Sequence, residues 1–302
     1  MGWISQDALT NDLTVNGKTD GFIFQKNFPA AGLAGHWHHL LGGAGSPPAA
    51  TFGGSELAFT ATDDTWSEGA LQHGGDKAPD SKHLIALGGS IVAAAGAPWF
   101  VLPVDLVGYV KLTTTNVSTT GAKTVAMTPI GASGAKVDRY ANGAGLRLFV
   151  GAIAAMGANA PTLQIAYTNQ AGVAGRVTTA GCVSTASATN GTILNSGNTA
   201  NKYGPFLPLQ GNDTGVRDIE TLTWGGTAHA SGSAIIGLCY PLASLPIPVP
   251  ATGLFNLFDF VNTIPSFPRV RDGANIQFLV FNTGATSSGA TFYAAGQYAW
   301  GS

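Results

Sequence analysis

Residues 84–104, LIALGGSIVAAAGAPWFVLPV, decide between a membrane-spanning chain and a β protein. The segment carries no charge throughout its 21 residues, and about 20 apolar residues are enough to span a bilayer as a helix. Glycines at 88, 89 and 96 and prolines at 98 and 103 nevertheless divide it into pieces of strand length. No excess of Lys or Arg flanks either end, as a span would require. We therefore expect two buried strands joined by a Gly/Ala/Pro turn, and no contact with a membrane.

The composition of the whole chain agrees with a β protein. Of its 302 residues, 42 are glycine and 10% are charged, against about 7% and about 25% in an average domain. The only glutamates are Glu56, Glu68 and Glu220, so the charged faces of amphipathic helices cannot be built. Two compatible explanations remain: many tight turns that need glycine, or a surface covered by other subunits, where charge is depleted.

Strand-like runs bounded by turn residues recur from residue 84 onward. They combine β-branched and aromatic residues with short polar breaks, the pattern of a β-sandwich or jelly roll. The clearest runs are 104–115, 146–150, 162–167, 218–223, 233–240, 275–281 and 290–300. We predict a mainly β protein whose residues 84–302 form a jelly-roll-like sandwich.

Two parts of the chain depart from this pattern. Residues 1–83 are rich in Gly and Pro and contain only two short candidate strands, 21–25 and 56–60, so we predict an extended, loop-rich arm or a small β module. Residues 254–264, LFNLFDFVNTI, place apolar side chains at helical spacing. We expect one short helix there.

Several classes of function are disfavoured by charge and cysteine content. The formal net charge is −2, and the eight lysines and six arginines are scattered singly, so no basic stripe is available to neutralise nucleic-acid phosphates. Cys182 and Cys239 lack the spacing of a metal or redox site. Residues 1–7 have no basic stretch followed by an apolar run, so we expect no signal peptide.

Two clusters have residues that could carry chemistry. His36, His38 and His39 flank Trp37, and with Asp63, Asp64 or Glu68 they could hold one metal ion; packing against Trp37 is the alternative. The pair Asp63-Asp64 could serve in acid/base chemistry, but neighbours on a strand point to opposite faces, and the surrounding Thr and Gly favour a solvated loop. We predict no enzyme, no cofactor and no metal.

The carboxy-terminal part of the chain resembles the ends of structural proteins of tailed bacteriophage virions. The residues that carry the likeness are LASLP (242–246), FNLFDFVNTIPSFPRVRDGA (255–274) and the final YAWG (298–301). The resemblance implies a β-rich virion component present in many copies, such as a capsid-decorating or cement protein assembled in the host cytoplasm. Its implied partners are further copies, in a trimer or another symmetric oligomer, and the major capsid protein or other virion proteins.

Contacts between subunits are expected at aromatic and arginine side chains, which are enriched at interfaces. Arg269 and Arg271 would share one face of an extended segment and could bind carboxylates of a neighbour; an internal pair of Arg271 with Asp272 or Asp259 is the alternative. The predicted interface residues are Trp37, Phe255, Phe258, Phe267, Arg269, Arg271 and Trp300.

Two other functions share most of these features. A jelly-roll major capsid protein would have the same composition and the same strands. A receptor- or glycan-binding tail module would instead expose aromatic side chains such as Trp66 or Trp224 on a sugar-binding face.

Overall fold

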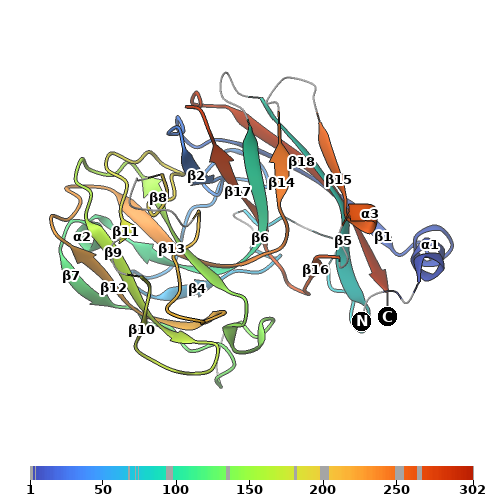
Figure 1. The fold of residues 1–302 in the computed structure, drawn as a ribbon, viewed down its shortest axis with the longest axis horizontal. Coiled ribbons are helices and arrows are strands. Elements are labelled where there is room, and N and C mark those ends of the chain that lie inside the picture. The colour runs from blue at the N-terminus through green and yellow to red at the C-terminus, as the bar shows by residue number, and fades with distance from the viewer. Residues whose placement is uncertain are drawn as a thin grey trace.

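The computed structural model describes residues 3, 5–66, 69–71, 73, 75–92, 98–133, 137–179, 182–197, 204–248, 255–263 and 267–301. Three sheets built from antiparallel strand pairs account for most of this chain, as the sequence predicts. Figure 1 shows β7 to β13 gathered at one end of the molecule and β1, β5, β15 and β18 at the other. The mainly β fold is thus confirmed.

The first sheet has six strands in the order β15-β5-β18-β1-β3, with β16 also pairing β5. It brings the amino-terminal strand β1 beside the carboxy-terminal strand β18 along the full length of β1. The strands are β1 (Thr19–Asn27), β3 (Gly45–Ser46), β5 (Ser81–Val92), β15 (Asn256–Asp259), β16 (Arg269–Val270) and β18 (Thr291–Gly301).

The second sheet has seven strands in the order β2-β17-β6-β13-β8, with β14 and β4 also pairing β6. The third has five strands in the order β10-β9-β12-β7, with β11 also pairing β9. The second contains β2 (His36–His39), β4 (Phe59–Ala61), β6 (Trp99–Leu112), β8 (Arg147–Ala154), β13 (Ser233–Pro241), β14 (Leu245–Ile247) and β17 (Ile276–Asn282). The third contains β7 (Gly121–Thr124), β9 (Thr162–Asn169), β10 (Arg176–Val177), β11 (Cys182–Val183) and β12 (Val216–Gly225).

Helices are short and peripheral. They are α1 (Gln6–Thr14), α2 (Thr114–Val117), α3 (Phe260–Thr263) and the single 3-10 turn Ala141–Gly143. The Ser5 side chain caps α1 by accepting a hydrogen bond from the Ala8 amide at 3.1 Å. Within the described residues, none of these helices has the length and apolar character needed to cross a membrane.

The segment 84–104 forms two strands, as predicted. Its first part lies in β5 and its last part in β6, and the two strands belong to different sheets. β6 is covered on both faces, and such a strand reads as a continuous apolar run. β5 buries one face in the core, including Leu87 and Ile91. The joining residues 93–97 lie outside the described part of the chain.

Strand β6 connects two hydrophobic cores. Its first half pairs with β17 and β14, and its second half pairs with β13 and β4. Trp99 and Val101 belong to the core beneath the six-stranded sheet, whereas Val107, Val110 and Leu112 belong to the core that faces β9 and β12. A third cluster covers the other face of the seven-stranded sheet, so β6 is buried on both sides.

A buried ion pair lies where the partners of β6 change. Asp105 is fully buried, and Arg139 donates from Nε and Nη2 to its two carboxylate oxygens, each at 2.8 Å. The Asn275 amide donates to Asp105 Oδ1 at 2.9 Å. Arg139 Nη2 also donates to the carbonyl oxygens of Thr62 at 3.0 Å and Leu106 at 3.2 Å. These bonds connect the loop between β7 and β8 and the residue before β17 to the middle of β6.

Two buried lysines attach loops to the six-stranded sheet. Lys26 Nζ donates to the carbonyl oxygens of Leu41 at 3.0 Å and Pro48 at 2.8 Å. Lys82 Nζ donates to the carbonyl oxygens of His73 and Gly75 and contacts His73 Nδ1 at 2.6 Å. Burial lowers the pKa of each lysine to about 8.

The predicted helix at 254–264 is present but shorter. It occupies only Phe260–Thr263, and the preceding residues Asn256–Asp259 form β15 along the edge of β5. Pairing with β5 gives the backbone groups of residues 256–259 hydrogen-bond partners in the sheet. The helical spacing of the apolar residues did not indicate this pairing. The ends 251–254 and 264–266 lie outside the described residues.

The predicted boundary at residue 83 stays a prediction. Between β1 and β5 the chain is loop-rich and contains only the short strands β2, β3 and β4 within its described residues. β1, from the predicted arm, lies in the same sheet as β5 and β18.

Replacing Arg139 tests the ion pair on β6. Arg139→Met leaves the Asp105 carboxylate buried without its cation, so we expect the free energy of unfolding in urea to fall by about 3–5 kcal/mol. The control is Lys18→Met, which removes a solvent-screened pair with Asp80 at 2.9 Å and should change stability far less than Arg139→Met, because exposed ion pairs contribute little. Equal small losses in both variants would show that the pair does not hold the junction.

Candidate intersubunit surface

The six-stranded sheet has one face in the core and one face largely open. In β1 the side chains of Phe22 and Phe24 are buried in the core, so Ile23 between them points outward with 77% of its surface exposed. Strand pairing sets Ile23 beside Ala295, Ala295 beside Gly88, and Gly88 beside Leu257. Leu257 is 65% exposed. A row of apolar or small side chains therefore crosses the sheet from β1 to β15.

This row is part of a wider surface, which we name the outer face. It consists of the outward-pointing residues of β1, β18, β5 and β15 together with Phe255, which is 49% exposed. Its members are Gly21, Ile23, Gln25, Ala86, Gly88, Ser90, Phe255, Leu257, Asp259, Tyr293, Ala295 and Gln297. Asp259, at the end of β15 and paired with Ala86, is the one charged residue among these members. Its Oδ1 accepts a hydrogen bond from the Val261 amide at 2.8 Å.

Close packing fixes the position of Phe255 on this face. A Cβ atom added to Gly88 would lie 2.1 Å from Phe255 Cε1, a separation that atoms cannot adopt. Glycine at 88 therefore lets the phenyl ring lie directly on β5. The ring is held as part of a flat apolar surface.

The chain covers the other end of the same face. Leu9 of α1 packs on Ile85 and Ala299, and the ring of Trp3 contacts His83 at 5.5 Å and Phe267 at 5.8 Å. A free monomer seldom leaves large apolar side chains such as Ile23, Phe255 and Leu257 exposed on the uncovered part of a sheet face. In Figure 1, α1 lies at this end of the sheet, near both chain termini.

The predicted aromatic interface residues lie in different places. Phe255 belongs to the outer face, whereas Phe258 packs against Phe260 at 5.3 Å and Phe267 against Trp3. Trp37 is half-buried against Phe281 at 5.4 Å, and Trp300 lies beneath Lys77 Nζ at 4.3 Å. Their contact with a neighbouring subunit stays a prediction.

The two arginines differ in their surroundings. Arg269 in β16 is exposed, and Arg271 is half-buried with its guanidinium 4.9 Å from the centre of the Tyr140 ring. Tyr140 in turn stacks on Tyr240 at 4.6 Å. Arg271 thus contacts an aromatic ring of its own chain, a cation–π arrangement that sequence reasoning did not consider. An intersubunit role for either arginine stays a prediction.

The histidine cluster is part of the interior. His38 and His39 are buried, and His39 Nε2 donates to the Ala152 carbonyl oxygen at 3.0 Å. The Leu33 amide donates to His38 Nε2 at 3.2 Å. Across the described part of the chain, no three His, Cys, Asp or Glu side chains gather as a metal site would need.

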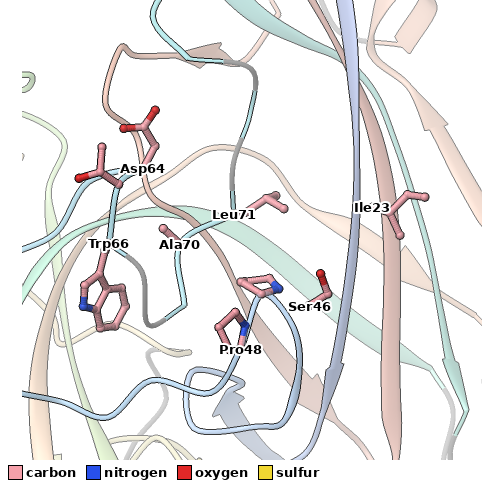
Figure 2. A pocket seen from close by; sticks show the side chains of 9 residues that line it. Ile23, Ser46, Pro48, Asp64, Trp66, Ala70 and Leu71 are labelled. Carbon is pink, nitrogen blue, oxygen red and sulfur yellow. The ribbon is translucent and has the colours of Figure 1, made fainter.

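The acidic pair Asp63-Asp64 lies in a turn. Asp63 Oδ1 accepts from the Thr65 amide at 2.9 Å, and Asp64 Oδ2 lies 3.8 Å from His73 Nε2. Asp64, Thr65 and Trp66 line one side of a pocket of about 310 Å³ whose other side is formed by Ile23 and the loop at Ser46 (Figure 2).

The structure also places the two tryptophans that a glycan-binding module would use. Trp224 is 1% exposed, so it cannot form a sugar-binding face. Trp66 is half-buried at the pocket, and a glycan-binding role for it stays a prediction. A serine–histidine contact also exists, with Ser184 Oγ 2.8 Å from His229 Nε2, but both residues are fully buried and Ser184 cannot reach a substrate. Cys182 and Cys239 are free and buried.

Sequence reasoning missed Ile23 and Leu257. In the sequence, GFIFQ is apolar at three successive positions, so the pattern does not show which of these side chains faces solvent. For Leu257, the helical spacing of apolar residues predicted a helix where the structure has strand β15. Alternation along a known strand is the signal that finds both.

Comparisons with known proteins give little further information. No protein-family model and no curated protein match this sequence. Among solved structures, the chain weakly resembles the infectious bursal disease virus VP2 subviral particle, with 9% identity, a TM-score of 0.20 and coverage of 93% of this chain and 80% of that chain. The infectious bursal disease virus Gt strain gives 7% identity, a TM-score of 0.18 and the same coverage. Scores of this size do not establish a shared fold.

The buried histidines predict acid sensitivity. Burial lowers the pKa of His38 to about 3 and that of His39 to about 4, so only the unfolded chain takes up their protons between pH 6.5 and pH 5. Stability is full above pH 6.5 and falls below it, by about 2 kcal/mol per histidine at pH 5. Urea unfolding at both pH values measures this, and His38→Gln and His39→Gln should each reduce the difference. An unchanged difference in both variants would contradict the prediction.

Proposed function

We propose that this chain is a virion structural protein that assembles in many copies and stabilises a capsid as a decorating or cement protein. The observation that carries the proposal is the outer face, which exposes Ile23, Phe255 and Leu257 and has Asp259 as its one charged member. Large exposed apolar patches mark sites of association. The resemblance of the carboxy-terminal sequence to tailed-bacteriophage structural proteins supports the same role.

Burial of this face supplies the energy of assembly. Each 1,000 Å² of apolar surface removed from water contributes up to about 25 kcal/mol before the costs of association. In a closed lattice each copy meets several neighbours, so modest contacts add through multivalency. The proposal needs no catalytic step and no cofactor, and its partners are other copies of the chain and the major capsid protein.

Charged substitutions on the outer face test this proposal. The double change Ile23→Lys and Leu257→Lys places two cations on the surface to be buried, while both side chains point to solvent in the single chain. We expect unchanged thermal unfolding and loss of the associated species in size-exclusion chromatography with light scattering.

Val173→Lys is the matched control. Val173 is 51% exposed, lies between β9 and β10 away from the outer face, and should leave association intact. Equal association of all three proteins would remove the outer face as the contact.

Electron microscopy separates decoration from the alternative role of major capsid protein. A decorating protein binds preformed empty capsids of the virus that encodes it and forms no shell alone. Closed shells from the purified chain would instead identify a major capsid protein, and neither result would refute the proposal of a virion component.

A further inference from the structure

Strand β1 has an edge that the chain itself leaves largely unpaired. β18 pairs with β1 from Thr19 to Asn27 on one side. On the other side β3 covers only Gln25 and Lys26. Within the described residues, no strand pairs with 19–24 on this edge. Unpaired strand edges are templates for the addition of another strand.

The backbone groups of alternate residues point to this edge. The Asn27 amide donates to the Ala44 carbonyl oxygen at 2.9 Å on the β3 side, whereas the Phe28 amide donates to the Ala290 carbonyl oxygen at 2.8 Å beside β18. Since direction alternates along a strand, the amides of Ile23 and Gly21 point to the open edge. The Gly21 amide is in fact bonded to its neighbour's side chain, Asp20 Oδ1, at 2.8 Å.

Open space lies against this edge. The pocket of about 310 Å³ is bordered by Ile23 on one side and by residues 46–48, 64–66 and 70–71 on the other. Figure 2 shows β1 beside these loops, with the Ile23 side chain pointing away from them. A strand added beside β1 would enter the pocket at its Ile23 end.

We propose that two copies of the chain pair antiparallel through the open edges of β1, about a two-fold axis at Gly21. The inference rests on the proposed assembly function and specifies one of its contacts. In this register Gly21 faces Gly21, and Thr19 of each copy faces Ile23 of the other. Residues 19–23 suffice, so β3 keeps its place beside Gln25 in both copies. A register centred on Phe22 would bring Thr19 of the second copy to the position that Ser46 occupies.

The side chains of residues 19–23 favour a second copy of the chain as the strand that pairs with the open edge of β1. A two-fold contact satisfies the same edge groups on both partners at once. No like charges stand opposite each other, because Asp20 faces Phe22. The residues meeting on the outer side are Thr19, Gly21 and Ile23, which are uncharged, so the outer face continues from one six-stranded sheet into the next. The Asp20 carboxylate must release the Gly21 amide, which then donates to the partner's carbonyl oxygen.

Disulfide cross-linking tests the register. Directly opposed residues in a hydrogen-bonded pair have Cα atoms about 5.5 Å apart, a separation that a disulfide spans. A Cβ at Gly21 would have its nearest contact at 3.4 Å, the Gly296 carbonyl oxygen, so Gly21→Cys should fold. We expect it to form disulfide dimers at least about tenfold faster than the control, because pairing holds the thiols at an effective concentration in the millimolar range.

Gln25→Cys is the matched control. It lies on the same strand and the same face but is covered at its edge by Ser46, and in the proposed register it does not face its own copy, so it should form few disulfide dimers under the same oxidation. The native Cys182 and Cys239 are buried and should not interfere. Equal cross-linking rates for the two variants would overturn the proposed pairing.

Hydrogen exchange of the unaltered chain gives a second readout that no substitution can perturb. The Ile23 amide should gain protection as protein concentration rises, while the Phe22 amide, which points to β18, stays protected throughout. An associated protein whose Ile23 amide exchanges freely would refute strand pairing and leave the assembly function standing. A protein that never associates would refute both.

Discussion

The arrangement of the two cores depends on a single buried ion pair in the middle of β6. One strand passes from one core to the other, and around the point of passage its neighbours change from β17 to β4 on one edge and from β14 to β13 on the other. Asp105 occupies this point, and Arg139 satisfies both of its carboxylate oxygens. An apolar pair at this point would be buried without a preferred orientation. The two hydrogen bonds from the Arg139 guanidinium to the Asp105 carboxylate instead fix which loops contact β6. The six-stranded sheet and its outer face are positioned through this junction.

The low charge of the chain has two separate physical causes. Part of it follows from burial, since β6 is covered on both faces and β5 on its core face, and buried faces tolerate few charges. Those that remain inside, such as Lys26 and Lys82, bind carbonyl oxygens of loops. The other part appears on the outer face, where exposure gives no reason for the absence of Lys or Glu. Contact with further copies supplies that reason, and the open edge of β1 shows where such a contact can continue the sheet.

Much of the fold could be predicted from the sequence. Runs such as 162–167 and 233–240 became β9 and β13 because alternation or continuous apolar character matches a strand. The helix at 254–264 was only partly right, because pairing with β5 outweighs helical spacing in residues 256–259. The surface was harder to predict. Phe255 was predicted as an interface residue, and the structure leaves 49% of it exposed. Ile23 lies among apolar neighbours, and only the position of β18 and the core beneath shows which side of β1 faces solvent. Tyr140 as the partner of Arg271 required the fold itself.

The central claim is that the outer face, with its exposed apolar side chains, is buried by other copies or partners in an assembly. Sedimentation velocity of the unaltered chain over a range of concentrations tests it most directly. The single chain has a mass of 30.7 kDa, and we expect a heavier species whose proportion grows with concentration. Because burial of apolar surface drives the association, it should persist at high salt, unlike pairing of exposed charges. A single 30.7 kDa species at every concentration would contradict self-assembly through this face.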